Sequence, residues 1–344
     1  MFKKLVQKFS KDIGIDLGTA NTLVYERGRG IVINEPSVVA INQKTGKILA
    51  VGSQAKKMVG KTPSHISAVK PLTKGVISDF EVTEQMLKYF ISQIHKQVLS
   101  IMPKPRIVIG IPSQITPVEK KAVYDAGLSA GARSVYLIEE PMAAAIGAKM
   151  PVQDAKGSMI IDIGGGTTEI AVISLGGIVK SISLRLAGDK LNQDIIHYMR
   201  DEFNIIIGER TAEELKIAIG SVFPLKKILT AKICGRDLTS GLPKETLVNN
   251  NHIRMAMYNS IKLMLKNIRE VLEETPPELM TDIMQKGIAL VGGGGLLRGL
   301  DQLVIKHTKA PVLVDQDPLT TVVRGAGMVL ENIDELKEVL STNF

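Results

Sequence analysis

The chain has 344 residues, of which 44% are hydrophobic and 23% charged, a composition typical of a globular protein large enough for two domains. Its one cysteine excludes an internal disulfide and a zinc site built from several thiolates, and its five histidines show no metal-ligand spacing. The net charge of +8 suits an anionic partner, but aromatic residues make up only 4%, so a membrane surface is favoured over nucleic acid.

The first twelve residues predict a membrane-targeting segment, because apolar residues recur at helical spacing and lysines take the remaining positions. The apolar residues are Phe2, Leu5, Val6 and Phe9. Packing of this helix on the protein's own surface is the alternative. A second apolar stretch, expected between a helix and a strand, is either another membrane contact or a buried turn. Its apolar residues include Leu99, Ile101 and Met102.

The rest of the chain contains an internal duplication. Residues 13–32 and 159–179 each begin with an apolar strand that ends in Asp-apolar-Gly, and each continues through a small-residue turn into a second β-rich run. This pattern predicts a β-hairpin whose turn exposes backbone N–H groups.

A strand, a helix, a second strand and a second helix then follow each hairpin. The first copy comprises 106–112, 117–130, 134–138 and 142–149, and the second comprises 287–291, 296–306, 311–314 and 319–330. An acidic residue and a proline precede the last helix in both copies, at Glu140-Pro141 and Asp317-Pro318. Two copies of one design predict an α/β fold with two domains facing each other across a cleft.

Two regions without an internal counterpart predict one small inserted subdomain in each half. After segment 1–12, the first large subdomain is expected to combine 13–35, 70–144 and 318–344, with a small subdomain at 36–69. The second large subdomain is expected to combine 145–185 and 247–317. Its small subdomain at 186–246 is expected to contain the helices 189–203 and 211–220.

Three glycine-rich turns are candidates for phosphate binding, because glycine allows backbone N–H groups to approach a phosphate closely. They are Gly18-Thr19-Ala20-Asn21, Gly164-Gly165-Gly166-Thr167-Thr168 and Gly292-Gly293-Gly294-Gly295. Neither a Walker-type loop nor a dinucleotide-binding GxGxxG motif is present, so a triphosphate is expected between two hairpin turns. Asp16 and Asp162 end the paired strands and are expected to hold hydrated Mg²⁺. The alternative for each aspartate taken alone is a turn-stabilising side chain.

Five ordered motifs resemble those of a known superfamily. DLGTANT, IEEPMAAAIG, DIGGGTTE, GERTAEELK and GGGGLLRG are similar to the nucleotide-site motifs of actins, sugar kinases and DnaK-type chaperones, and most of all to those of the bacterial actin family MreB. The resemblance runs from about residue 11 to the C-terminus. It implies an actin-like ATPase fold that binds ATP and Mg²⁺.

The resemblance also implies roles for particular residues. Residues 18–21 and 164–166 would cradle the phosphates, and residues 292–295 would pack against the adenosine. The nucleoside would be lined by residues of one helix, namely Ala212, Glu213, Glu214, Leu215 and Lys216. Hydrolysis needs a group that orients or deprotonates the attacking water. Glu140 matches the family's water-orienting acid and Thr167 a residue near the γ-phosphate, with Glu139 as the neighbouring competitor.

The function implied by the resemblance is that of a cytoskeletal ATPase. Such a protein polymerises at the inner face of the cytoplasmic membrane, organises peptidoglycan synthesis and maintains rod shape. Its implied partners are other copies of itself, the anionic membrane surface, RodZ, MreC, MreD and wall-synthesis enzymes. The alternative is a sugar or acetate kinase on the same fold, although the short inserted regions leave little room for a sugar pocket.

Overall fold

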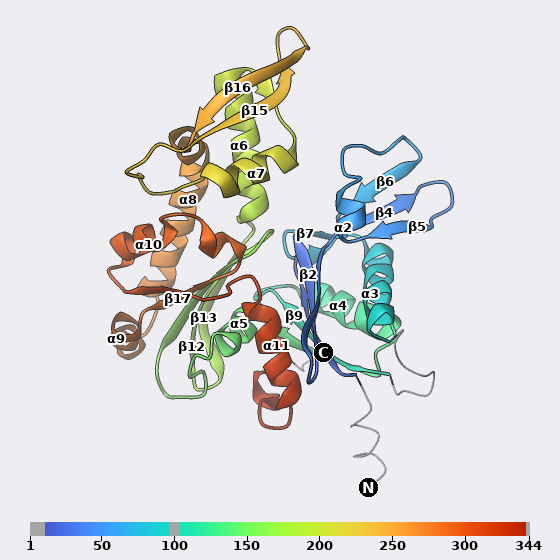
Figure 1. Cartoon of the computed structure of the whole chain (residues 1–344). Coiled ribbons are helices and arrows are strands. Elements are labelled where there is room, and N and C mark those ends of the chain that lie inside the picture. The colour runs from blue at the N-terminus through green and yellow to red at the C-terminus, as the bar shows by residue number, and fades with distance from the viewer. Residues whose placement is uncertain (1–10, 96–103, 342–344) are drawn as a thin grey trace. The chain divides into compact units, whose positions relative to one another are not determined.

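A computed structural model describes residues 11–95 and 104–341 (Figure 1). The predicted membrane contacts therefore lie outside the described residues and stay predictions. These contacts are Phe2, Leu5, Val6, Phe9, Leu99, Ile101 and Met102. The chain divides into two compact units. Unit 1 comprises Met1–Ala155, Ile173–Ile178 and Leu319–Phe344, and unit 2 comprises Lys156–Val172 and Val179–Pro318. The finer division into four subdomains stays a prediction.

In the described part of unit 1, the largest sheet is mixed and five-stranded. In spatial order its strands are β10 (Ser134–Glu139), β9 (Arg106–Ile111), β1 (Ile13–Leu17), β2 (Asn21–Glu26) and β3 (Gly30–Pro36). Strands β10, β9 and β1 run parallel, whereas β2 is antiparallel to both β1 and β3. The parallel strands are largely apolar and buried, as expected for strands covered on both faces. Their carboxyl ends meet at one edge of the sheet.

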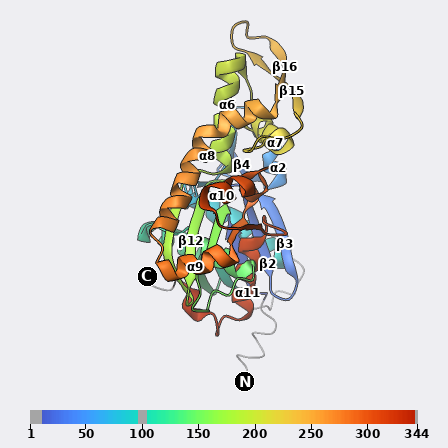
Figure 2. The same ribbon diagram turned by 90° about the vertical axis from the view of Figure 1, so that its left-hand side faces the viewer.

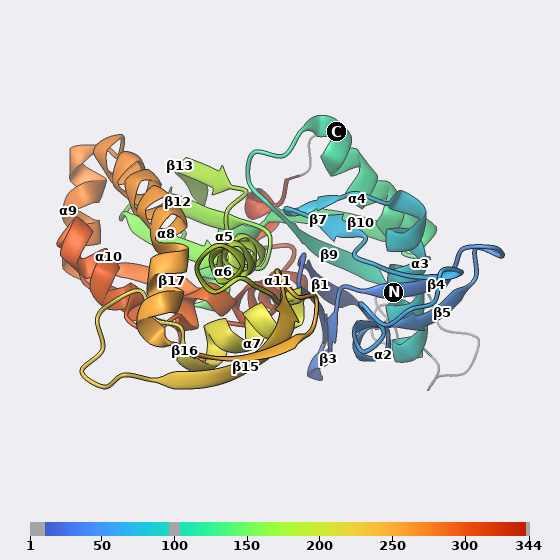
Figure 3. The same cartoon turned by 90° about the horizontal axis from the view of Figure 1, so that it is seen from above.

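Helices pack on both faces of this sheet (Figure 3). They are α3 (Phe80–His95), α4 (Pro117–Ser129), α5 (Glu140–Gly147) and α11 (Thr321–Glu331). Ile13 and Ile15 of β1 belong to a core shared with residues of α3 and α4. The intervening residue Gly14 faces Ala326 of α11, since a methyl group there would lie 3.2 Å from the Ala326 side chain. Alternation along the strand thus assigns each face to a different pair of helices.

The backbones of helices α5 and α11 are in direct contact. A methyl group on Gly325 of α11 would overlap the carbonyl oxygen of Ala143 and lie 2.6 Å from its carbonyl carbon. A methyl group on Gly147 of α5 would overlap the carbonyl oxygen of Thr321. The absence of side chains at these two glycines lets the helix backbones touch. This contact fixes α5, whose first residue is Glu140, against α11.

Smaller sheets complete unit 1 between β3 and α3. Strands β5 (Ile48–Val51), β4 (Val39–Asn42) and β6 (Ile66–Val69) form an antiparallel sheet with the short helix α2 (Ser53–Lys56). Val38, Ala40 and Ala55 form its small core. Strands β7 (Leu72–Thr73) and β8 (Val76–Ile77) pair as a hairpin that leads into α3.

A second five-stranded sheet lies mostly in unit 2. In spatial order its strands are β13 (Gly177–Leu184), β12 (Thr168–Ser174), β11 (Ser158–Ile163), β17 (Ile288–Val291) and β18 (Val312–Val314). Strand β17 is parallel to both β11 and β18. The long helix α8 (Asn250–Glu273) and the helix α9 (Pro277–Lys286) lie across one face of this sheet (Figure 2). Residues of α8 and of β11 and β12 share one apolar core.

The same core continues into the inserted part of unit 2. This part contains α6 (Gly188–Phe203), α7 (Glu209–Ile219) and a sheet of β14 (Ile205–Ile206), β15 (Thr230–Asp237) and β16 (Pro243–Asn249). Helices α7 and α8 both pack against α6. The core thereby connects the inserted sheet to the five-stranded sheet through α6 and α8.

The predicted repeats are confirmed as secondary structure. Both hairpins are present, and each is followed by the predicted strand, helix, strand and helix within a few residues of the expected bounds. The helix expected at 296–306 instead begins at Leu300, as α10 (Leu300–Thr308), and a 3₁₀ helix, η1 (Gly293–Leu296), precedes it. The left-handed backbone of Gly299, at φ 76°, separates the two helices. Helices α8 and α9 were not among the predicted elements.

Candidate functional site

The first glycine turn of the duplication connects β1 to β2 in unit 1. Ser37 Oγ donates a hydrogen bond to the Gly18 carbonyl oxygen at 2.5 Å, and Thr19 Oγ1 accepts one from the Gly75 N–H at 3.0 Å. A methyl group on Gly18 would lie 2.6 Å from the Asn21 carbonyl oxygen, so the turn requires glycine there. Hydrogen bonds from two other segments therefore restrain the turn, so its backbone is preorganised for binding a ligand.

Asp16 and Glu140 lie at the same edge of the unit 1 sheet. Asp16 pairs in register with Gly110 of β9, and Gly110 pairs with Ile138 of β10, two residues before Glu140. A methyl group on Gly110 would lie 3.5 Å from Glu140 Cγ, so the Glu140 side chain packs over Gly110. Withdrawal of its carboxyl group from water raises the pKa of Asp16 to about 7. The parallel register thus brings two sequence-predicted carboxylates to the same edge of the sheet, on either side of β9.

Glu139 and Glu140 have different surroundings although they are adjacent in the chain. Glu139 ends β10 with extended backbone angles, and Glu140 is the first residue of α5. Burial raises the pKa of Glu139, and the positive charge of Lys120 on α4 partly opposes this shift. Glu140 instead packs over Gly110, the strand neighbour of Asp16. This placement favours Glu140 over Glu139 for chemistry at the strand ends, and the assignment stays a prediction.

The second glycine turn connects β11 to β12 in unit 2. The Gly164 N–H donates to the Thr167 carbonyl oxygen at 2.9 Å, which closes the turn. The first residues of α6 also contact the turn, because the N–H groups of Gly188 and Asp189 donate to the carbonyl oxygens of Gly164 and Gly165 at 3.1 and 2.8 Å. The N-terminus of α6 is therefore fixed beside this turn, where its partial positive charge favours an anion.

The third glycine turn packs against the strand end that carries Asp162. A methyl group on Gly292 would overlap Oδ1 of Asp162, and one on Gly294 would lie 2.7 Å from Cβ of Ile163. Gly292 has a φ of 76°, which a residue with a side chain rarely adopts. The sequence predicted the aspartate and the glycine run separately, and the tertiary structure brings them into contact. Asp162 itself is only 6% exposed.

The residues after the second turn divide into structural and candidate positions. Thr168 Oγ1 donates to the Leu186 carbonyl oxygen at 2.7 Å, and Glu169 accepts a hydrogen bond from Ser183 Oγ at 2.5 Å. Both bonds join β12 to the segment that follows it. Thr167 belongs to the turn itself and is buried, and its proposed place near a γ-phosphate stays a prediction.

The predicted nucleoside residues lie on different sides of α7. Ala212 and Leu215 are buried in the core of unit 2, and Glu214 forms an exposed ion pair with Arg210 at 2.8 Å. Lys216 Nζ donates to the carbonyl oxygen of Gly188 at 2.8 Å, which connects α7 to the second glycine turn. Glu213 is half-buried on the same part of the helix. Of this predicted set, Lys216 contacts Gly188, whose N–H is bonded to the second glycine turn.

A metal ion would have to be held largely through water. Within residues 11–95 and 104–341, no group of three or more His, Cys, Asp or Glu side chains forms a metal site. Asp16 and Asp162, each at a strand end beside a glycine turn, suit Mg²⁺, because this ion usually keeps several waters and takes few protein carboxylates. The expectation that both aspartates serve one ion involves both units and stays a prediction.

Comparisons with known proteins identify the family of the chain. A family model described as MreB/Mbl protein matches residues 10–338. The chain belongs to the MreB/Mbl family. It is 50% identical over 328 residues to the cell shape-determining protein Mbl of Bacillus subtilis, covering 95% of this chain and 98% of that protein. It is 49% identical over 338 residues to the cell shape-determining protein MreB of Escherichia coli, covering 97% of each.

Solved structures confirm the predicted fold. MreB5 of Spiroplasma citri, solved bound to ADP, is 40% identical to the chain and superposes with a TM-score of 0.89, covering 95% of this chain and 98% of that one. A MamK double helical filament, at 23% identity and a TM-score of 0.79, shows the same fold. The actin-like α/β fold and the resemblance to MreB are therefore confirmed. Membership of the MreB/Mbl family also disfavours the kinase alternative.

Several contacts of this MreB/Mbl chain were not predicted from its sequence. Gly110, Ser37 and the Gly188-Asp189 pair all contact a predicted turn or carboxylate. Gly188-Asp189 carried a usable signal, because a glycine and an aspartate before an amphipathic run are typical of a helix start. Gly110 and Ser37 carried none, since their roles depend on strand pairing. The described helices include none with the length and hydropathy needed to cross a bilayer.

Proposed function

We propose that the chain is a cell-shape cytoskeletal protein that binds ATP with Mg²⁺, hydrolyses it and assembles into filaments. The observation that carries the proposal is the same in both units: a strand-end aspartate lies beside a glycine turn that neighbouring segments hold in place. MreB5 of Spiroplasma citri, 40% identical to this chain, has been solved bound to ADP and bound to AMPPNP. Relatives at about 50% identity are named cell shape-determining proteins.

In the proposed site, the turns at 18–21 and 164–166 offer backbone N–H groups to the phosphates. Lys216 and the N-terminus of α6 add positive charge beside the second turn. Bound Mg²⁺ would neutralise phosphate charge, with Asp16 and Asp162 holding its waters. Glu140 would orient the attacking water from its position over Gly110.

The proposed membrane association has a structural basis in the described flanks of the two candidate segments. Lys11 Nζ donates to the Ile94 carbonyl oxygen at 3.0 Å. Lys11 is where the described chain begins, and Ile94 lies next to the end of α3, just before the second candidate segment. The described residues that flank the two segments predicted to contact lipid therefore lie next to each other in unit 1. Such an arrangement lets both contact one bilayer, and a filament would multiply their weak individual affinities.

The proposal is tested by pelleting and phosphate release with ATP, ADP and AMPPNP, each with and without anionic vesicles. We expect ATP to promote filaments that associate with the vesicles. Glu140→Ala should still bind ATP but release phosphate roughly 10²-fold more slowly, the usual scale for one such group. Glu139→Ala is the matched control and should hydrolyse ATP normally. Filaments that form equally without nucleotide, or a loss of hydrolysis in Glu139→Ala alone, would reject the assignments.

The membrane element has its own test. Deletion of residues 1–9 should abolish flotation of ATP filaments with anionic vesicles unless the stretch at 99–102 suffices alone. A second variant therefore makes that stretch polar in addition. If both variants float like the unmodified chain, neither segment is the anchor.

A further inference from the structure

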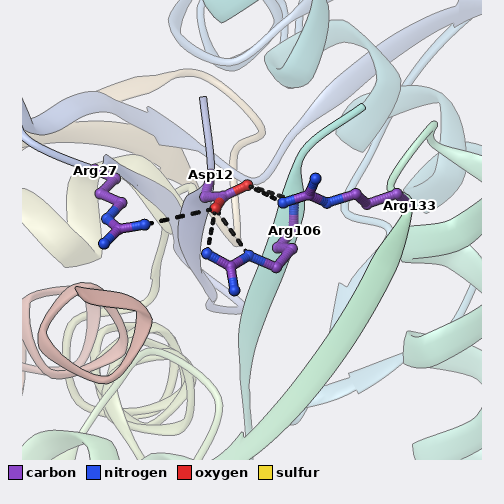
Figure 4. Close-up of polar contacts among 4 residues, drawn as sticks. All are labelled: Asp12, Arg27, Arg106 and Arg133. Carbon is purple, nitrogen blue, oxygen red and sulfur yellow. Dashed lines mark hydrogen bonds and ion pairs between the residues drawn. The ribbon is translucent and has the colours of Figure 1, made fainter. Parts of the chain in front are cut away.

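Three arginines converge on one buried carboxylate at the amino ends of the parallel strands of unit 1 (Figure 4). Arg106 donates its backbone N–H to Oδ1 of Asp12 at 2.8 Å, and its Nε and Nη2 contact Oδ2 at 2.9 and 2.8 Å. Nη2 of Arg133 donates to Oδ1 at 3.3 Å, and Nη1 of Arg27 lies 4.0 Å from Oδ2. Asp12 is fully buried. This sheet edge is the one opposite the predicted nucleotide residues.

Asp12 carries one negative charge, and one arginine is enough to neutralise it. Arg106 alone contacts both carboxylate oxygens, because its backbone N–H donates to Oδ1 and its guanidinium group contacts Oδ2 through Nε and Nη2. The further guanidinium groups of Arg27 and Arg133 bring like charges together, which costs free energy unless another anion is near. Their side chains are 40% and 28% exposed. A guanidinium has five N–H donors and matches phosphate oxygens in pairs, so the exposed sides of both groups suit a phosphate.

The arginines belong to a larger positive surface, here called the basic edge. It consists of Lys11, Arg27, Arg29, Lys104, Arg106 and Arg133. Its acids are Asp12 and Glu26, both buried, and Glu26 pairs with Arg29 at 2.7 Å and Lys11 at 3.3 Å. Six cations over two buried carboxylates leave a net charge of +4 facing outward. Glu331, which accepts a hydrogen bond from Tyr25 at 2.7 Å, is an exposed acid beside this edge, and counting it lowers the net charge from +4 to +3.

The course of the chain identifies the occupant of the basic edge. The described chain begins at Lys11, which contacts Ile94 near the end of α3. It resumes at Lys104, next to Pro105, whose carbonyl oxygen accepts the Arg133 N–H at 2.9 Å. Both segments predicted to contact lipid are thus attached at this edge. A bilayer reached by those segments would meet the basic edge, and its phosphate groups complement the positive charge.

We propose that the basic edge binds the anionic phospholipid headgroups of a bilayer, with Arg27 and Arg133 as phosphate ligands held in place through Asp12. The inference rests on the proposed membrane association and adds a headgroup site on the folded body of unit 1. It implies a preference for anionic over neutral lipid that does not depend on apolar insertion.

The test uses the full chain and vesicles of phosphatidylcholine with 0% or about 30% phosphatidylglycerol. The variant Arg27→Gln/Arg133→Gln removes two charges but leaves Arg106 paired with Asp12. The control Arg200→Gln/Arg269→Gln removes two exposed charges from unit 2, where these side chains are 55% and 71% exposed. A third variant, Arg27→Lys/Arg133→Lys, keeps the charge. Thermal melting confirms that each variant is folded.

We expect the Gln variant to need roughly 25-fold more anionic lipid for half-maximal flotation, about fivefold for each arginine near the surface. The control should stay within about threefold of the unmodified chain. The Lys variant should recover most of the affinity, and added salt should narrow the differences. Equal affinities for the Gln variant and the control overturn the inference, as does a Lys variant that behaves like the Gln variant.

Failure of the proposed function gives a different result. Polymerisation with ATP is measured on the same proteins without lipid. If the unmodified chain forms no filaments, the cytoskeletal proposal fails, whatever the lipid affinities. If it forms filaments that ignore anionic vesicles, the membrane association and the basic edge fail together. If filaments float normally while the Gln variant matches the control, only the basic edge is rejected.

Discussion

Substitution of Gly325 by alanine sets two physical effects against each other. Gly325 lies inside α11, where alanine is favoured over glycine by about 1 kcal/mol in helix propensity. The new methyl group, however, would overlap the carbonyl oxygen of Ala143 and lie 2.6 Å from its carbonyl carbon and 3.0 Å from the Gly147 nitrogen. These neighbours are backbone atoms of α5 and cannot rotate away. The two helices must therefore move apart.

The magnitude follows from this geometry. Ordinary contact begins at 3.4 Å, so relief of the overlap with the Ala143 carbonyl oxygen requires α5 and α11 to separate by more than about 1 Å. Overpacking of a well-packed core typically costs about 1–3 kcal/mol, and a backbone clash lies at or beyond the upper end of this range. After the gain in propensity, we expect a net loss of about 2 kcal/mol. For a unit of this size that corresponds to a fall in melting temperature of roughly 4–8 °C.

Thermal unfolding measures this effect directly. The control is Asn259→Ala, at an exposed position inside α8, which gains helix propensity without a new core contact and should be neutral or slightly stabilising. Because α5 begins at Glu140, the displacement should also lower phosphate release more than nucleotide affinity. An unchanged or higher melting temperature for Gly325→Ala would refute the argument, since propensity would then outweigh the helix contact.

Three further perturbations have clear expected outcomes. Asp12→Asn removes the negative charge that three arginines share, so it should lower the free energy of unfolding, measured by urea denaturation, by about 3 kcal/mol. A loss below about 1 kcal/mol would contradict the role of this cluster. Asp16→Ala or Asp162→Ala should weaken the Mg²⁺-dependent part of ATP affinity in calorimetry, and unchanged affinity in both variants would rule out the metal assignment. Burial raises the pKa of Glu139, so its contribution to stability is present below its ordinary value of 4.5 and is lost as pH rises through the folded pKa. The melting temperature of Glu139→Gln should therefore rise relative to the unmodified chain between pH 4.5 and 7, whereas a constant difference would show that Glu139 does not titrate in this way.

Local features of the sequence were sufficient to predict the elements that depend on nearby residues. The hairpins at 13–32 and 159–179 follow from an apolar strand that ends in Asp-apolar-Gly and a small-residue turn, all within about twenty positions. The start of α4 follows from Thr116 and Glu119, which form a capping box, and from the proline that directly follows Thr116. The duplication of these patterns also predicted an α/β fold with two repeated halves. Such signals act over a few residues, so they can be read without knowing the fold.

Runs of residues were predicted less well than single elements. The resemblance marked all of 212–216 as nucleoside-lining, but α7 buries Ala212 and Leu215 and turns Lys216 toward Gly188. A helix distributes consecutive residues over all of its sides, so one motif can serve both core and site. The predicted helix start at 296 was wrong, because the left-handed conformation of Gly299 interrupts the run and the helix begins one residue later.

Only the tertiary structure decided which distant residues meet. The pairing of Asp16 with Gly110, the packing of Glu140 over Gly110 and the overlap that makes Gly292 necessary beside Asp162 depend on strand register and helix placement. The convergence of three arginines on Asp12 likewise requires the parallel strands β1, β9 and β10 to begin, and the antiparallel strand β2 to end, at the same edge. The sequence by itself determined the turns, the candidate carboxylates and the repeated order of elements, because these are encoded by neighbours in the chain. Contacts between positions about a hundred residues apart depend on how the sheets and helices pack, and no local pattern specifies that packing.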